Sequence, residues 1–177
     1  MKIPYRYLQI IEDNANWEKL SMRRDLPESF IEKYWDKLDL TEVLYFSKVS
    51  EEFLDRHSLY FFKTFDDEKN KKVLSAITVC QKVSEKFIEK YLVHYPSLWF
   101  HISAKQKLSE EFMEKYKDQL NWRMVSIYQK LSQEFVEKFI KFVDLQAIIK
   151  YQTHLSTTFL KRIKDEYKRQ ESKNSYY

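Results

Sequence analysis

The feature that most constrains the fold is a nine-residue phrase that recurs along the chain. It reads LSEEFMEKY at residues 108–116 and LSQEFVEKF at residues 131–139, which begin 23 residues later. The other copies are LPESFIEKY from residue 26, VSEKFIEKY from 83, and the weaker VSEEFL from 49 and LSTTFL from 155. Successive starts are 23, 34, 25, 23 and 24 residues apart. Self-similarity at such a period is typical of repeat architectures, in which each copy is one supersecondary unit.

A second phrase lies between the copies of the first and indicates that each unit holds two helices. Asn-Trp stands at 121–122 before the copy at 131, and again at 16–17 before the copy at 26. Trp99 takes the same place before the copy at 108, and YQKLS at 128–132 is echoed by YQTHLS at 151–156. Both helices are expected to be near ten residues long, a length that is marginal in isolation. Each helix must therefore bury its apolar side against its partner and the next unit.

Within a unit, the residue types are placed as two amphipathic helices require. Ser109 and Ser132 are expected to cap the first helix by accepting a hydrogen bond from a free backbone N–H. Glu110 and Glu111 follow in the first turn, where the helix dipole favours negative charge. Pro27 suits the first turn of its copy, because the N–H that it lacks has no partner there. The inner side of the two helices is expected to hold Leu108, Phe112, Met113, Tyr116, Trp122, Val125 and Ser126, with Ser21, Thr78 and Ser103 as small equivalents of Ser126.

These patterns predict an all-α fold, an α-solenoid of about six stacked short helical hairpins with a repeat of about 23–25 residues. Residues 1–177 are expected to form a single helical-repeat domain. The absence of glycine favours the same class, because type I′ hairpin turns prefer Asn-Gly or Asp-Gly. The copy from 49 is about ten residues too long, and its excess, 62–72, is either an insert on the binding face or a longer helix with a charged end. Residues 161–177 form a basic tail with six Lys and Arg and three Asp and Glu.

The glycine and histidine positions argue against an active site. A chain without glycine offers no phosphate-cradling loop, dinucleotide fingerprint or nucleophile elbow. The histidines form no His-x-x-x-His pair, and the one cysteine, Cys80, is expected to be a buried, inert thiol. His57 takes the position of Tyr34 and Tyr116, which predicts a packed ring. The chain is therefore predicted to be non-enzymatic, with no cofactor and no metal site.

Charge and hydropathy restrict the expected partners. No apolar run approaches the ~18 residues of a membrane span, and no signal-peptide core follows Met1, so no membrane partner is expected. The net charge is +4, of which +3 lies in the tail from Lys161 onward. A repeat body so close to neutral is a weak electrostatic footprint for nucleic acid.

The outward positions of the second helices are the predicted binding surface. The first helices present Lys and Glu to solvent, whereas the second helices carry Tyr, Phe, Arg and Met, which are enriched in protein interfaces. The alternative for each of these residues is packing against the adjacent unit. Together with three residues of the insert region, the predicted partner-binding set is Tyr45, Phe46, Phe100, His101, Arg123, Met124, Tyr128, Tyr151, Phe65, Lys71 and Lys72.

The two phrases resemble the short helical repeats that recur in proteins of bacteriophages and large DNA viruses. Residues 108–130 and 131–154 match best, the copies at 26 and 83 match well, and residues 49–82 depart from the pattern. The resemblance carries no catalytic residues. It implies a viral or prophage origin and an interaction role in the host cytoplasm.

Three functions are consistent with these observations. The first is a non-catalytic module that binds a host or viral protein, for example an inhibitor of a CRISPR-type nuclease or another host defence system, with a ribonucleoprotein as a further target. The second is nucleic-acid binding through Arg23, Arg24, Lys71, Lys72 and the tail at 161–173, which would weaken steeply with salt. The third is a self-assembling structural protein whose aromatic faces close a homodimer.

Overall fold

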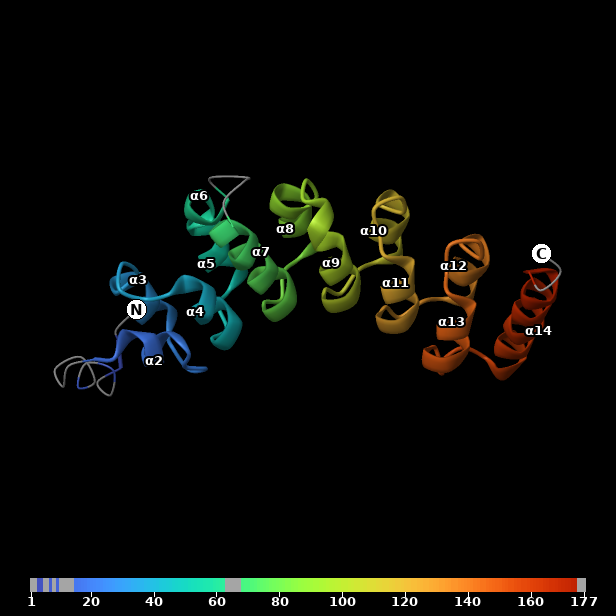
Figure 1. The fold of residues 1–177 in the computed structure, drawn as a ribbon, viewed down its shortest axis with the longest axis horizontal. Helices are drawn as coiled ribbons and strands as arrows, with labels where there is room; N and C mark the ends of the chain where they lie inside the picture. Colours follow the sequence, from blue (N-terminus) through green and yellow to red (C-terminus); the bar gives the residue numbers. More distant parts are fainter. Residues whose placement is uncertain (1–2, 5–6, 8, 10–14, 63–67, 175–177) are drawn as a thin grey trace. The chain divides into compact units, whose positions relative to one another are not determined.

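In the computed structural model of this chain, residues 3–4, 7, 9, 15–62 and 68–174 are described. Every regular element in this part of the chain is a helix, which confirms the all-α prediction (Figure 1). Within the same residues, no helix combines the length and the apolar character that crossing a bilayer would require. The chain divides into two compact units, Met1–His94 (unit 1) and Tyr95–Tyr177 (unit 2).

In both units, first and second helices follow one another in turn along the chain. Unit 1 holds α2 (Trp17–Ser21), α3 (Glu28–Lys33), α4 (Leu40–Phe46), α5 (Glu51–Arg56), α6 (Ser58–Phe61), α7 (Glu68–Cys80), α8 (Glu85–Phe87) and the π-helix η1 (Ile88–Leu92). Unit 2 holds the 3₁₀-helix η2 (Pro96–Leu98), α9 (Trp99–Lys105), α10 (Glu110–Lys115), α11 (Trp122–Tyr128), α12 (Gln133–Lys138), α13 (Leu145–Tyr151) and α14 (Thr157–Asn174).

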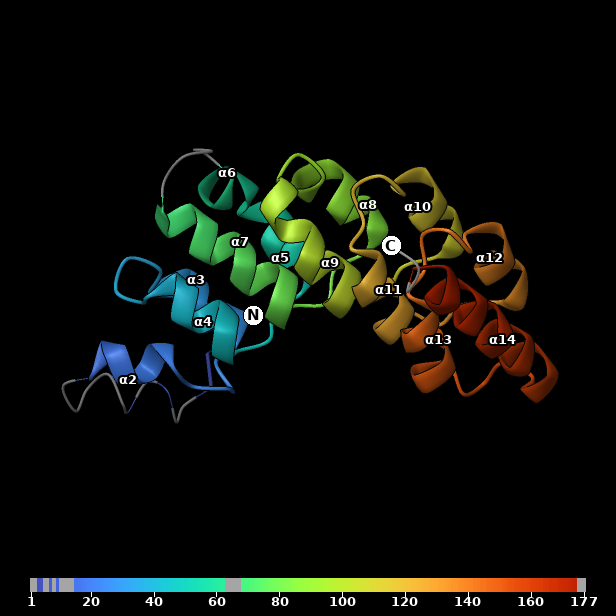
Figure 2. The ribbon, with the colours of Figure 1, turned by 45° about the vertical axis from the view of Figure 1, so that its right-hand side comes forward.

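Each predicted repeat start lies at a fixed distance before the start of a helix. A first helix begins two residues after the starts at 26, 49, 83, 108, 131 and 155, giving α3, α5, α8, α10, α12 and α14. The second helices are α2, α4, α7, α9, α11 and α13. In unit 2, α11 packs against both α9 and α13, and α14 packs against α13 (Figure 2). In unit 1, α4 packs against α2 and α7.

Side-chain caps at the helix starts explain why the repeats begin where they do. Ser109 and Ser132 accept hydrogen bonds from the backbone N–H of Phe112 and Phe135 at 3.1 and 3.0 Å, as predicted. Asn121 caps α11 in the same way through the N–H of Met124 at 3.0 Å. The prediction for Pro27 was wrong by one position: it is the N-cap of α3, in extended conformation, because the helix begins only at Glu28.

The helices are shorter than expected, with six residues in α10 and α12 and seven in α9, α11 and α13. Their ends explain both the length and the absence of glycine. Tyr116, the C-cap of α10, has φ −109° and ψ 24°, and its carbonyl oxygen accepts from the N–H groups of Gln119 and Leu120 at 2.9 and 3.2 Å. The chain therefore turns at a residue with negative φ, where a Cβ fits without strain, and needs no left-handed glycine cap.

A buried glutamine closes the C-terminal end of the preceding second helix. The side-chain Nε2 of Gln129 donates to the carbonyl oxygens of Ser103 and Gln106, both at 2.8 Å. Its Oε1 accepts from the N–H of Leu108 at 3.1 Å. One glutamine thus satisfies two carbonyl groups of the repeat before it and the first N–H of its own repeat, and its side chain is almost fully buried.

The same arrangement recurs one repeat later and in unit 1. Gln152 donates to the carbonyl oxygens of Ser126 and Gln129 at 2.8 and 2.7 Å and accepts from the N–H of Leu131. Gln81 donates to the carbonyls of Leu44 and Ser47 and accepts from the N–H of Val49. These side chains join consecutive repeats within each unit and take the place of the usual glycine-dependent helix caps.

The small residues of the second helices do more than permit close packing. Ser126 is fully buried, and its hydroxyl donates to the carbonyl oxygen of Trp122 at 2.7 Å while it accepts from the N–H of Asp144 at 2.9 Å. Ser21 makes the equivalent pair of bonds, to Trp17 and from Asp39. The serine at this position therefore sets the start of the next second helix.

Aromatic rings form the core between the two helix types. In unit 2, the Trp122 ring lies 6.2 Å from Phe135 and 5.2 Å from Phe139, centroid to centroid. In unit 1, His57 packs 4.6 Å from Trp35 and 4.7 Å from Phe53, which confirms the predicted packed ring. Equivalent clusters are Trp17, Phe30 and Tyr34 in unit 1, and Trp99, Phe112 and Tyr116 in unit 2.

Apart from Phe62, which follows the end of α6, the two irregular regions of the sequence are helical where they are described. Residues 63–67 of the predicted insert lie outside the described residues, and 68–72 belong to α7, which at 13 residues is longer than the seven-residue second helices. This part of the excess matches the alternative of a longer helix. The basic tail, up to residue 174, belongs to the 18-residue α14.

Candidate interaction surface

Ion pairs connect neighbouring first helices within each unit. In unit 1, Arg56 pairs with Glu32 and Lys90 with Asp55, both at 2.7 Å. In unit 2, Lys138 pairs with Glu114 at 2.5 Å, and Arg162 pairs with Glu137. These partners lie one repeat apart, so the charged side of the first helices serves contacts between repeats.

First-turn carboxylates have a similar role. Glu110 accepts from the backbone N–H of Ser132 at 2.6 Å and from its hydroxyl at 3.1 Å. Glu51 accepts from Ser84 in the same way at 2.5 and 2.7 Å. The carboxylate of one first helix thus fixes the N-cap of the next, which gives these acidic residues a structural use.

The electrostatics of unit 1 reflect these pairs. Hydrogen bonds from Lys90 and Tyr91 hold the pKa of the Asp55 carboxyl below its usual value. The hydrogen bonds of Lys90 with Asp55 and Tyr91 raise the pKa of Lys90 to about 12. The Arg56 guanidinium, with His57 contributing, lowers the pKa of Glu32. The carboxylates are thus held in their charged form.

A lowered carboxyl pKa contributes stability that is present above the ordinary pKa and is lost as pH falls through the lowered value. We therefore expect the melting temperature to be nearly constant from about pH 6 to about pH 9 and to fall below about pH 4. Asp55→Asn should weaken the acid dependence, as measured by circular dichroism melts across this range. The exposed Asp36→Asn is the matched control, and an equal change in both variants would contradict the assignment.

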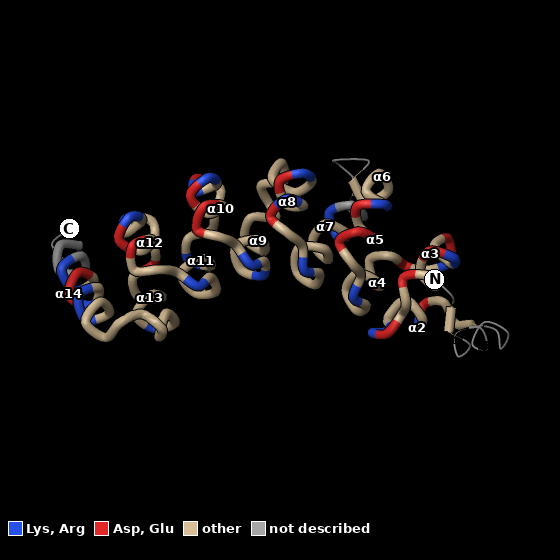
Figure 3. The backbone as a smooth tube through the Cα atoms, turned by 180° about the vertical axis from the view of Figure 1, so that it is seen from behind, with Lys and Arg blue, Asp and Glu red and all other residues tan. Residues whose placement is uncertain are grey.

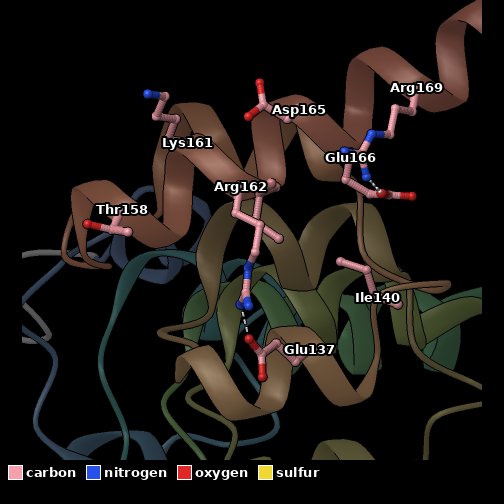
Figure 4. Close-up of a pocket in the computed structure, with 9 residues that line it drawn as sticks. Glu137, Ile140, Thr158, Lys161, Arg162, Asp165, Glu166 and Arg169 are labelled. Carbon is pink, nitrogen blue, oxygen red and sulfur yellow. Dashed lines mark hydrogen bonds and ion pairs between the residues drawn. The ribbon is translucent and has the colours of Figure 1, made fainter.

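A groove with a volume of about 620 Å³ lies between α12 and α14. It is lined by Glu137, Ile140, Thr158, Lys161, Arg162, Ile163, Asp165, Glu166 and Arg169. Figure 4 shows the Arg162 side chain crossing it to Glu137, and Arg169 beside Glu166, with which it pairs at 3.7 Å. Three basic and three acidic residues share this lining, so the groove carries no dominant charge. The ion pair of Arg162 with Glu137 repeats the contact between first helices seen at Lys138 and Glu114.

The structure places the predicted binding residues in two groups. In unit 2, Phe100, Tyr128 and Tyr151 are 49%, 57% and 46% exposed on α9, α11 and α13, and the Arg123 side chain is 73% exposed. His101 and Met124 are half-buried on the same helices. In unit 1, Tyr45 and Phe46 are exposed at the end of α4, and Lys71 and Lys72 are exposed on α7. Phe65 lies outside the described residues.

Three members of the unit 2 group, Arg123, Tyr128 and Tyr151, contact charged residues that were not predicted. The Lys105 ammonium of α9 lies 5.9 Å from the ring centroid of Tyr128 on α11. Arg123 of α11 lies 3.9 Å from Asp144, the N-cap of α13. Lys150 covers the ring of Tyr151 at 5.1 Å. Each of α9, α11 and α13 therefore carries an exposed aromatic ring and an exposed basic side chain.

Several lysines on this side of unit 2 were not part of the predicted set. The second helices and the linkers after them contain five basic residues and one acidic residue, Asp144. They occupy segments 98–109, 121–132 and 144–156. The first-helix segments 110–120 and 133–143 contain six acidic and four basic residues. Figure 3 shows both charge colours on α10 and α12 and blue along α9 and α11. We name the exposed residues Phe100, Lys105, Lys107, Arg123, Tyr128, Lys130, Lys150 and Tyr151 the second-helix surface.

A sequence signal for the missed lysines exists. Lysine directly follows the buried glutamine at 106–107 and 129–130, and also at 81–82 in unit 1. The whole-chain charge concealed this pattern, because the acidic residues of the first helices offset the lysines.

The structure corrects the prediction for the one cysteine. Cys80 was expected to be buried, but it is half-buried at the last position of α7, where one side of the helix meets solvent. Among the described residues, no cluster of three or more His, Cys, Asp or Glu side chains has the geometry to hold a metal ion.

Comparison with known proteins found no matching family model, and no curated protein or solved structure with significant similarity to this chain.

Proposed function

We propose that this chain is a non-catalytic helical-repeat protein, an α-solenoid of about six hairpins, that binds a protein partner through the second-helix surface of unit 2. The observation that supports this most is the set of half-exposed rings of Phe100, Tyr128 and Tyr151, one on each successive second helix. Rings are the side chains that most often dominate binding energy in protein interfaces.

The first helices are the weaker candidate for a binding surface. Their exposed residues are mostly charged, and several already pair with the next repeat, as Glu114 does with Lys138 and Glu137 with Arg162. A partner that used them would have to replace existing ion pairs. The second-helix surface offers apolar area and cations together, which suits a hot-spot cluster with a polar rim.

The resemblance to viral repeats supplies the proposed partner class, a host defence complex such as a CRISPR-type nuclease. Affinity capture from host lysate, followed by mass spectrometry, tests this directly. The wild-type chain should retain one defined complex, and the Phe100→Ala/Tyr128→Ala variant should lose most of it, because truncating hot-spot rings costs about 2 kcal/mol or more each.

The matched control is Glu111→Ala/Lys117→Ala, which changes two exposed residues of the α10 segment and should retain the complex. Circular dichroism verifies that both variants keep the helical content of the wild type. Capture that survives the loss of both rings would overturn the surface assignment.

A further inference from the structure

From α9 to α13, charge is separated between the two helix layers of unit 2, whereas the last first helix, α14, is itself basic. The acidic residues lie mostly in the first-helix segments, and the second-helix segments carry five cations against one carboxylate. We propose that the partner of this chain presents an acidic protein surface, with carboxylates that meet the lysines of the second-helix surface. This rests on the proposed function and adds the chemistry of the partner to it.

The lysines of this surface differ from those of the first helices. Lys138 is held by the neighbouring carboxylate of Glu114. Within the part of the chain that the structure describes, Lys105, Lys107 and Lys130 are exposed and form no ion pair. Their charge is therefore available to a partner.

The single carboxylate of this layer is already engaged. Asp144 accepts a hydrogen bond from the N–H of Ala147 at 2.9 Å, where it caps α13, and its other oxygen lies 3.9 Å from Arg123. It does not neutralise the lysines of α9 or of the following linkers. The net positive charge of the surface thus has no internal counterpart, which favours a partner of opposite charge.

The rings distinguish an acidic protein from a nucleic acid. Lys105 lies over the ring of Tyr128, and Lys150 lies over that of Tyr151, so an ammonium group occupies one face of each ring. Single-stranded nucleic acids bind by stacking bases on open ring faces. A carboxylate that approaches Lys105 also comes close to the Tyr128 ring, so ion pairing and apolar contact can occur at the same place.

The test uses the full chain and a defined probe, a fluorescein-labelled peptide of about 20 residues with leucines on one helix face and glutamates on the others. Fluorescence anisotropy at about 50 mM and about 300 mM salt measures the affinity, because screening acts on exposed charges. An oligothymidylate of about 20 nucleotides is the second probe. We expect the peptide to bind more tightly than the oligonucleotide and its affinity to fall with salt.

Charge reversal locates the site. Lys105→Glu/Lys130→Glu should weaken peptide binding by about tenfold or more, since reversing charges at an interface adds repulsion. The matched control is Lys117→Glu/Lys141→Glu, with the same change of net charge on exposed first-helix segments, and it should change affinity less than about threefold.

Three results would overturn the proposal: no binding of the acidic peptide, tighter binding of the oligonucleotide, or an equal loss in both charge-reversed variants. The capture experiment separates this failure from that of the proposed function. If the complex is lost with Phe100→Ala/Tyr128→Ala but retained by Lys105→Glu/Lys130→Glu, the binding surface is supported and the acidic partner is excluded. A complex retained by both variants removes the surface itself.

Discussion

Gln129→Ala is expected to destabilise unit 2 by at least about 3 kcal/mol, because it leaves buried backbone groups without partners. The glutamine side chain satisfies the carbonyl oxygens of Ser103 and Gln106 and the N–H of Leu108. Each such group costs about 1–3 kcal/mol when buried and unpaired. Urea unfolding followed by circular dichroism measures the free energy, and amide hydrogen exchange at Leu108 reports the loss locally.

Two variants control this prediction. Gln146→Ala changes an exposed glutamine on α13 and should alter stability by less than about 0.5 kcal/mol. Gln129→Glu keeps an acceptor for Leu108 but at neutral pH loses both donated bonds, and burial opposes its charge. Its folded-state pKa should therefore lie above the unfolded value, so this variant regains stability as pH falls. A Gln129→Ala chain as stable as Gln146→Ala would contradict the capping role.

Phe135→Ala is expected to cost about 3–5 kcal/mol, the usual range for removing a buried phenylalanine ring. Phe135 is 5% exposed and contacts the rings of Trp122 and Phe139, at 6.2 and 4.6 Å between centroids. Its loss opens a cavity where the two helix layers of unit 2 meet. Thermal melts should show a fall of about 12 °C or more, because about 1 kcal/mol corresponds to 4–8 °C in a unit of this size.

Phe142→Ala is the matched control for this cavity. Phe142 contacts the same tryptophan at 5.2 Å, but 45% of its surface is exposed. Its truncation removes less buried area and leaves a site that water can fill, so the expected loss is about 1 kcal/mol. Similar losses of stability in Phe135→Ala and Phe142→Ala would contradict the assignment of Phe135 to the core and of Phe142 to the surface.

The repeat starts were predictable because they depend on local rules. Ser109, Ser132 and Asn121 cap helices through backbone N–H groups three residues away, and the sequence contains both partners. The helix ends were less predictable, since they depend on atoms of another repeat. The bond from Gln129 to Ser103 spans 26 residues, and nothing in a single repeat indicates that this amide is buried.

The candidate surface was predicted in part for a similar reason. Phe100, Tyr128 and Tyr151 break the charged pattern of the outer positions, so they were recognised from residue type. Lys105 and Lys130 resemble any solvated lysine in the sequence. Their importance depends on which carboxylates lie beside them, and this follows from the folding of the acidic residues into the other helix layer.

The backward reach of the glutamines has a consequence for how such a chain can lengthen. Gln152 donates to two carbonyl oxygens of the repeat directly before it, as Gln129 does, and these acceptors are backbone groups. A tandem duplication of about 23 residues would therefore bring its own connecting side chain and N–H group and find the required carbonyl groups on any preceding copy. Growth by duplication needs no compensating substitution at the junction. The outer side chains of each new copy then remain free to diverge, and a longer array gains additional positions for recognition at little cost in stability.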